Sequence, residues 1–457
     1  MSNYQTPGVY VEEISKLPAS VAQVQTAIPA FIGYTAIQPE AQQAYAISSL
    51  RDYEELFGGP QQESYTATVE DTTVNGVISR SVSVAPSTNG SGHSRYKMYY
   101  SLQLFFQNGG GKCYIISIGD YDSGISKNDF LDGLAVLEKE DEPTLIVFPD
   151  ATSVAGNNPE QTYYDIVIQA LAQAANLGDR FVITDVFGDN ITGLRDKTGT
   201  DNLKYGAAYY PHLQTNTTYA YNEAGVTITH TVDDQPGTLP GNLAAVSEVS
   251  NELYNQIRQR LESYKVVLPP SGPVAGVYAR IDRMRGVWKA PANESINGII
   301  GPVLKITNAE QDGLNVDPEG GKSVNAIRTF TGKGTLVWGA RTLAGNDNEW
   351  RFVSVRRFYN MVEESLRKST AWAVFEANDT HTWIRIKSMI RNYLTGLWKQ
   401  GALAGGTPDT AFFVKVGLGE TMTAVDILEG RMNIEIGLAA VRPAEFIILK
   451  FSQKLQE

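Results

Sequence analysis

The chain has 457 residues, a formal net charge of −12 and an isoelectric point near 5.0. This acidic balance argues against a nucleic-acid-binding protein, which carries a dominant basic surface. The single cysteine, Cys113, excludes an intrachain disulfide, and no apolar run approaches the ~20 residues of a membrane-spanning helix. At ~150 residues per domain, the length favours about three domains with well-filled cores.

Strands and helices alternate along the first part of the chain. Short apolar runs predict strands, and the segments between them have apolar residues at helical spacing. The predicted strands are 30–35, 113–118, 144–148 and 180–184, and the predicted helices are 48–57, 99–106, 130–137 and 163–175. This alternation is typical of βαβ units and a largely parallel sheet.

Two segments, at about 60–97 and 188–248, interrupt this alternation. Both are rich in Thr, Ser, Asn and Gly, which predicts β-rich insertions, and the second is predicted to contain a hairpin near residues 226–229. A helical segment over 246–262 follows the second insertion. The middle region is therefore expected to be an α/β unit, residues 26–310, that carries two insertions.

The best candidate for a domain boundary is the Gly- and Asp-rich linker 308–322. Beyond it, the pattern predicts an α+β domain over 323–441. Its expected elements are strand 334–338, helix 353–377, a helix capped by Thr380 that reaches Leu397, and strand 411–416. The remaining segments, 1–25 and 442–457, are predicted to be arms.

Both ends of the chain have the composition of strands. Residues 9–14 follow Pro7-Gly8, residues 432–438 alternate between apolar and polar, and residues 445–451 are apolar on both faces. A strand at a chain end can pair with a neighbouring molecule without closing a loop. Two such ends therefore predict a subunit that is joined to others.

Two glycine-rich stretches are candidates for phosphate binding. Residues 320–323 (GGKS) resemble the end of a phosphate loop, but the motif needs glycine at position 316, which is Val316. Residues 108–112 (NGGGK) lie between a helix and a strand, the reverse of the order that places phosphate at a helix N-terminus. A structural linker and a helix stop are the favoured interpretations.

Catalytic signals are weak throughout the sequence. The four histidines are scattered without helical spacing, no Gly-x-Ser-x-Gly elbow occurs, and Cys113 opens an apolar strand as a buried, inert thiol. No cofactor or metal is predicted. Residues 349–400 carry nine basic and five acidic side chains, a local surplus of +4. This surplus indicates either a solvated helix face or a docking face for an acidic partner.

Five stretches resemble the contractile tail sheath family. They are residues 6–13 (TPGVYVEE), 105–114 (FFQNGGGKCY), 209–211 (YYP), 269–276 (PPSGPVAG) and 285–293 (RGVWKAPAN), and the last two are the most specific. Residues 334–341, 350–376 and the tail through Phe451 also fit. The resemblance covers most of the chain except the two insertions.

The resemblance implies a structural, non-enzymatic subunit of a phage tail, pyocin-like particle or extracellular injection system. In that family, subunits polymerise as a helical sleeve around an inner tube, and the sleeve contracts to drive the tube through a target envelope. Implied partners are further copies of the chain, possibly sheath paralogues, the inner tube protein, and baseplate and terminal cap proteins, with no nucleic acid or membrane. The sequence start lacks the pattern of a secretory signal, so we expect synthesis in a bacterial cytoplasm and incorporation into a particle.

The resemblance also assigns roles to residues of the two ends. The arms would donate strands to neighbouring subunits, the strand at 432–438 would receive them, and short connections would act as hinges. The basic residues of the helix that begins at Thr380 are candidates to face the tube. The arm residues are Val9, Tyr10, Val11, Ile14, Phe446, Ile447, Ile448, Leu449 and Phe451; the receiving residues are Ile434, Ile436 and Leu438; the hinges are Leu17, Pro18, Arg442 and Pro443; the tube-facing candidates are Arg385, Lys387, Arg391 and Lys399.

The alternative is a nucleotide- or sugar-handling α/β enzyme with an oligomerisation domain. Such an enzyme needs a glycine-rich turn directly after a strand, and neither glycine-rich stretch has that position. Microscopy of the purified chain separates the two hypotheses, because a sheath forms tubes or rings and an enzyme forms discrete small oligomers.

Overall fold

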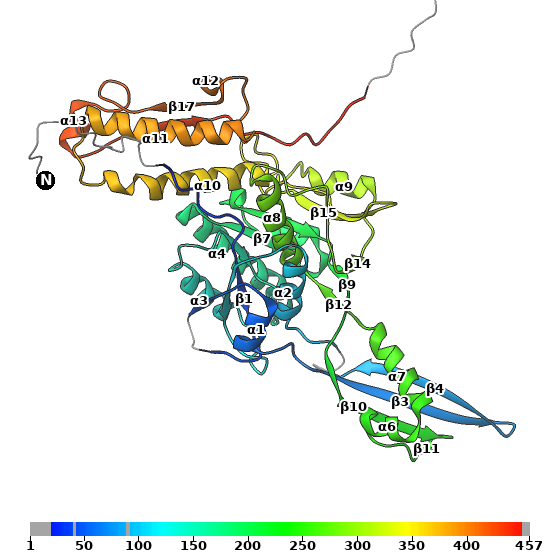
Figure 1. Cartoon of the computed structure of the whole chain (residues 1–457). Coiled ribbons are helices and arrows are strands. Elements are labelled where there is room, and N and C mark those ends of the chain that lie inside the picture. The colour runs from blue at the N-terminus through cyan, green and yellow to red at the C-terminus, as the bar shows by residue number, and fades with distance from the viewer. Residues whose placement is uncertain (1–19, 40–42, 88–91, 450–457) are drawn as a thin grey trace, which may run out of the picture. The chain divides into compact units, whose positions relative to one another are not determined.

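The computed structural model describes residues 20–39, 43–87 and 92–449 (Figure 1). The chain divides into two compact units. The larger unit is Gln25–Met361 together with Arg442–Glu457, and the smaller unit is Met1–Val24 together with Val362–Val441.

The larger unit is built on a nine-stranded sheet. Its central strands, from β15 to β5, run parallel, and antiparallel strands close both edges. The mixed α/β fold predicted from the sequence is therefore confirmed. In sheet order the strands are β13 (Glu294–Ser295), β16 (Gly334–Val337), β15 (Val324–Phe330), β8 (Gly206–Tyr210), β7 (Phe181–Asp185), β6 (Leu145–Val147), β1 (Pro29–Gly33), β5 (Cys113–Ser117) and β2 (Ala44–Ile47).

Helices cover both faces of this sheet, because successive residues of each strand contribute to different cores. Ala30 and Ile32 of β1 pack into one core and Phe31 into the other. Side chains of α3 and α4 lie in the first core, and those of α2 and α8 lie in the second. The helices are α1 (Leu50–Phe57), α2 (Met98–Gln107), α3 (Lys127–Leu137), α4 (Pro159–Leu177), α5 (Ile191–Lys197), α8 (Ser271–Arg285) and α9 (Asn308–Asn315), with 3₁₀ turns η2 (Ala151–Ser153), η3 (Phe187–Asp189) and η4 (Leu203–Tyr205).

The segment predicted as a second insertion contributes a strand to the main sheet. Strand β8 has the sequence GAAYY, which lacks the apolar run of its neighbours β6 and β7. Its small residues are required by close packing, since a Cβ atom at Gly206 would lie 2.6 Å from Leu171. The next strand, β9 (Leu213–Thr218), forms a three-stranded sheet with β12 (Lys265–Leu268) and β14 (Ile299–Pro302).

The remainder of that segment combines with the first insertion in a separate four-stranded sheet. Strands β3 (Glu63–Val74) and β4 (Val77–Pro86) form a hairpin, and β10 (Tyr221–Val232) pairs with β3 and with β11 (Gln235–Pro236). The hairpin turns at Asn75 and Gly76, both with positive φ. Helices α6 (Leu243–Val249) and α7 (Asn251–Ser263) pack on this sheet, and Ser250, which caps α7, separates them where one helix was predicted.

The predicted domain boundary at 308–322 does not separate the compact units. Helix α9 occupies the start of this segment, and β15 directly after it pairs with β8 in the nine-stranded sheet. Buried Val324, Ala326 and Ile327 tie β15 to the main cores. Strands β15 and β16, which the sequence analysis placed in the C-terminal domain, thus belong to the larger unit.

The smaller unit contains a two-stranded antiparallel sheet and several helices. Asp379, rather than the predicted Thr380, is the N-cap of α11, because its carboxylate accepts the Thr382 N–H. The elements are the second part of α10 (Val353–Thr370), η5 (Ala371–Ala373), α11 (Thr380–Lys399), α12 (Pro408–Ala411), β17 (Phe412–Lys415), α13 (Ala424–Leu428) and β18 (Glu435–Leu438).

Candidate assembly surfaces

The first candidate surface is the β17–β18 sheet of the smaller unit. Phe412 lies opposite Leu438, and Val414 lies opposite Ile436. The Ala439 N–H donates to the Ala411 carbonyl at 2.9 Å, so the backbone of Ala439 faces the strand that β17 continues, while the Ala411 N–H donates to the Thr407 carbonyl. Because bonded and non-bonded pairs alternate along antiparallel strands, the backbone groups of Ile436 and Leu438 face away from β17, and Leu438 is itself engaged in a contact.

Side chains of β17 alternate between the core and solvent. Phe412 and Val414 are buried, whereas Phe413 and Lys415 are exposed. The Phe413 ring lies over Gly437, where a Cβ atom would be 2.1 Å from the ring, so glycine is needed at this position. Of the three predicted receiving residues, Ile436 and Leu438 lie in β18, and Ile434 directly precedes the strand.

The predicted tube-facing cations lie on α11. Its buried face is formed by Ile386, Met389, Ile390, Leu394 and Leu397. Each of the four cations is half-buried or exposed. Within the smaller unit, Arg385 stacks 4.1 Å from the Trp372 ring, Lys387 lies 3.4 Å from Glu420, and Arg391 lies 3.1 Å from Asp409. Lys399 is exposed in the last turn of the helix. Surface ion pairs contribute little to stability, so these cations can exchange partners at small cost.

Part of the predicted basic surplus is internal. In the larger unit, Arg357 is buried against Asp282, with hydrogen bonds of 3.0 and 2.5 Å. Arg356 is also buried and stacks 4.3 Å from the Trp350 ring. These two arginines hold the core rather than a surface. Both interpretations of the charge surplus, solvated face and docking face, stay open for the α11 cations.

The second candidate surface is the start of the C-terminal arm, in the larger unit. Arg442 donates to the Asn348 carbonyl at 2.9 Å, and Glu445 pairs with Arg341. The next four residues, Phe446 to Leu449, are 72–81% exposed and lie in no strand. Four consecutive exposed apolar residues are unusual for a surface that remains in water. Of the other predicted arm and hinge residues, Val9, Tyr10, Val11, Ile14, Leu17, Pro18 and Phe451 lie outside the described residues.

A groove of about 610 Å³ lies beside the start of the arm. Its walls include Trp338, Phe352 and Gln311 of the body, and arm residues from Pro443 to Ile447 line one side. The arm therefore begins against its own body before its apolar residues reach solvent.

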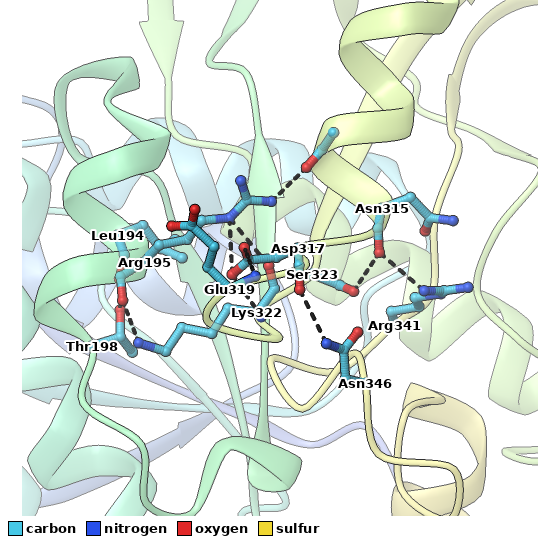
Figure 2. Close-up of polar contacts among 11 residues, drawn as sticks. Leu194, Arg195, Thr198, Asn315, Asp317, Glu319, Lys322, Ser323, Arg341 and Asn346 are labelled. Atoms are coloured by element: carbon cyan, nitrogen blue, oxygen red, sulfur yellow. Dashed lines mark hydrogen bonds and ion pairs between the residues drawn. The ribbon is translucent and has the colours of Figure 1, made fainter.

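The GGKS stretch forms a turn whose polar groups are used internally (Figure 2). The buried Lys322 ammonium donates to the Arg195 carbonyl at the end of α5, and the Lys322 N–H donates to Asp317 at 3.1 Å. Arg195 lies 3.4 Å from Asp317, and the Asn346 amide donates to the Asp317 carbonyl. The pKa of the Asp317 carboxyl lies below its usual value. Burial alone would raise this pKa, but the backbone N–H groups that donate to the carboxylate and the charge of Arg195 together lower it by more. These contacts are those of a structural turn.

Two buried carboxylates at the carboxyl edge of the parallel sheet hold helices in place. Asp150 accepts the N–H groups of Tyr34, Lys97 and Met98, at the start of α2. Asp185, the last residue of β7, accepts the N–H and hydroxyl of Ser271 at 2.8 and 2.6 Å, at the start of α8. Burial raises the pKa of each carboxyl to about 6.

Neither aspartate was among the predicted site residues. Neither α2 nor α8 has a local capping side chain, and the capping carboxylates come from segments 52 and 86 residues away. The available signal was an aspartate at the end of each of two buried strands. In open parallel sheets, ligands bind at the carboxyl edge of the strands. In this chain the two aspartates at that edge instead accept hydrogen bonds from the N-termini of α2 and α8.

Three of the four histidines contact other side chains in separate places, and the fourth, His381, is exposed in the first turn of α11. His93 stacks 4.2 Å from Tyr219, and burial lowers its pKa to about 4. His212 lies 3.1 Å from Asp189, and His230 lies 3.1 Å from Asp71. Residues 20–39, 43–87 and 92–449 contain no group of three metal-binding side chains. In the same ranges, no helix combines the length and apolar character that a bilayer crossing requires.

Comparison with known proteins places these features in a family. Residues 345–454 match the model of the phage tail sheath C-terminal domain. The tail sheath protein of Vibrio phage KVP40 is 26% identical over 139 residues, which are 30% of this chain and 20% of that protein. The contracted helical sheath of the anti-feeding prophage is 31% identical, with 99% of this chain and 100% of that chain covered and a TM-score of 0.66.

This chain belongs to the contractile tail sheath family. The contracted sheath complex of PVC, an extracellular contractile injection system, is 30% identical over 99% of both chains, also with a TM-score of 0.66. The family predicted from the five sequence motifs is confirmed. The match to the phage protein spans only a fifth of that protein, whereas the injection-system sheaths match along their whole length.

Proposed function

We propose that this chain is the sheath subunit of a contractile injection system, without enzymatic activity. It polymerises into a helical sleeve around an inner tube and contracts to drive the tube through a target envelope. The observation that carries the proposal is the end-to-end likeness to two injection-system sheaths, together with the exposed apolar arm. The positions of Asp150 and Asp185 support a structural role over an enzymatic one, because both carboxylates cap helices at the sheet edge.

Strand addition is the proposed joint between subunits. The arm that begins at Phe446 adds to the β17–β18 sheet of a neighbour, with Ile434, Ile436 and Leu438 on the receiving side, and the N-terminal arm contributes in the same way. Each backbone hydrogen bond contributes ~0.5–1.5 kcal/mol, so five bonds give a few kcal/mol. Burial of Phe446 and Ile448 adds ~1.5–3 kcal/mol for each side chain.

Contraction is proposed to be a rigid-body rearrangement. The compact units keep their cores, the arms keep their strand pairing, and new contacts between the units of different subunits release the free energy. A strand joint suits this role because its hydrogen bonds do not depend on how the two joined units are oriented.

The partners follow from this role. The α11 cations Arg385, Lys387, Arg391 and Lys399 face the inner tube, whose acidic groups they recognise. Baseplate and terminal cap proteins contact the two ends of the sleeve. The chain is made in a bacterial cytoplasm and acts within an assembled particle.

Electron microscopy of the purified chain tests the proposal. Full-length protein is expected to form tubes or rings, and a variant that ends at Glu445 is expected to remain a folded monomer. Circular dichroism and thermal unfolding check the fold of the truncated variant. Discrete small oligomers from the full chain, or intact tubes from the truncated chain, would refute the proposal.

A further inference from the structure

Arg341 is a buried arginine whose carboxylate partner lies on the C-terminal arm. Arg341 is 4% exposed, and its guanidinium donates to the Glu445 carboxylate through Nε at 2.9 Å and through Nη2 at 2.5 Å. The third guanidinium nitrogen, Nη1, donates to the Asn315 carbonyl at 3.0 Å. A two-bond pair of this kind fixes the position of the carboxylate as well as neutralising the arginine.

The backbone of Arg341 is held by the main sheet. Its N–H donates to the Asn325 side chain at 2.8 Å, and its carbonyl accepts the Asn325 amide at 2.8 Å. The same amide also donates to the Ala208 carbonyl in β8, so Asn325 connects Arg341 to two parallel strands. Arg341 is thus fixed at both ends, whereas Glu445 belongs to a segment without strand pairing.

Among the described residues of the arm, Glu445 makes the last side-chain hydrogen bonds to the body. Before it, Arg442 bonds to Asn348, and Pro443 and Ala444 line the groove. After it, Phe446 and Ile447 still line the groove, but these two residues and the next two are 72–81% exposed. We propose that Arg341 is a positioning residue that fastens the C-terminal arm to its own body up to Glu445. The pivot of the arm then lies between Glu445 and Phe446, three residues beyond the hinge predicted at Arg442 and Pro443.

This inference rests on the proposed sheath function for its consequence in assembly, but the attachment itself belongs to the monomer. An arm with a fixed starting point has fewer orientations to lose when it pairs with a neighbour. Loss of the Arg341–Glu445 pair is therefore expected to raise the critical concentration for polymerisation about threefold to tenfold, through the entropy of the extra free residues.

Spin labels on two introduced cysteines test the attachment in the monomer. Cys113 is fully buried, so Ala444→Cys and Ile448→Cys can be labelled selectively, with the unmodified chain as the labelling control. At protein concentrations below the onset of assembly, the label at 444 is expected to be restrained and the label at 448 mobile. Glu445→Gln should release the label at 444 and leave that at 448 unchanged. Glu349→Gln, which neutralises an exposed carboxylate, is the matched control and should change neither.

The two measurements separate this inference from the proposed function. Equal mobility at 444 in the Glu445→Gln variant and the parent would overturn the attachment, whatever the chain assembles into. A released label with an unchanged critical concentration would overturn its role in assembly. A parent chain that forms no polymer would count against the sheath function, while the label at 444 would still decide the attachment.

Discussion

The nine-stranded sheet and the β17–β18 sheet differ in size and in how their described strands are covered. The large sheet is covered on both faces, closed at its edges by antiparallel strands, and supplied with buried carboxylates that fix its helices. The small sheet has two described strands of four residues each. Two-stranded sheets are marginal in water, and a third strand improves them greatly. The large sheet thus carries most of the described core, and the small sheet is the proposed site for assembly.

The largest expected effect separates assembly from stability. Ile448→Asp places a charge in the arm where we expect an apolar contact with a neighbour, so polymer formation should be abolished. The free energy of unfolding of the monomer should change by less than ~0.5 kcal/mol, since Ile448 is exposed. Sedimentation and chemical unfolding measure the two quantities. Ile448→Leu keeps the apolar surface and should assemble normally; polymers from Ile448→Asp would contradict the comparison.

The reverse result is expected in the large sheet. Asp150→Ala leaves three N–H groups without their acceptor, two of them buried and that of Lys97 partly buried, at ~1–3 kcal/mol for each, so the free energy of unfolding should fall by about 3 kcal/mol or more. Urea unfolding provides the measurement. Asp132→Ala, at an exposed position on α3, should leave stability unchanged. Equal stability of these two variants would show that Asp150 has no structural role.

The pH dependence of stability provides a second test of the structural role of Asp150. The pKa values of Asp150 and Asp185 are about 6 in the folded chain against an ordinary value of 3.8, so the folded state retains these protons to a higher pH. Their contribution to the free energy of unfolding is greatest below pH 4 and decreases as pH rises to about 6, by at most about 3 kcal/mol for each group. Urea unfolding between pH 4 and 6 should show a less negative slope for Asp150→Asn than for the parent. Identical slopes would place the pKa of Asp150 outside this window.

The smallest expected effect on the monomer concerns α11. Replacing Arg385, Lys387, Arg391 and Lys399 with Gln should leave the unfolding midpoint unchanged, because these side chains lie outside the core. Sleeve formation on added inner tubes should become slower at low salt, and the difference from the parent should vanish at high salt. Light scattering at two salt concentrations checks this. An unchanged rate at low salt would favour the solvated-face interpretation of these cations.

Local periodicity predicted much of the fold and little of the arm attachment. Strands β1, β5, β6 and β7 were found because each is a continuous apolar run, and α1 was found from its Ser49 cap and the glycine that follows it. Strand β8 was missed because small residues, not apolar ones, fit its place between neighbours. The Arg341–Glu445 pair joins residues 104 positions apart, a separation across which a single sequence gives no pairing signal.

The β3–β4 hairpin offers a site for protein engineering. The strands turn through Asn75 and Gly76, both with positive φ, and the flanking Val74 and Val77 are 58% and 69% exposed. Exposed hairpin tips of this kind accept inserted sequence without disturbing a core. A peptide placed between Asn75 and Gly76 would be displayed once per subunit, and a sleeve of many copies would become a repetitive scaffold for it.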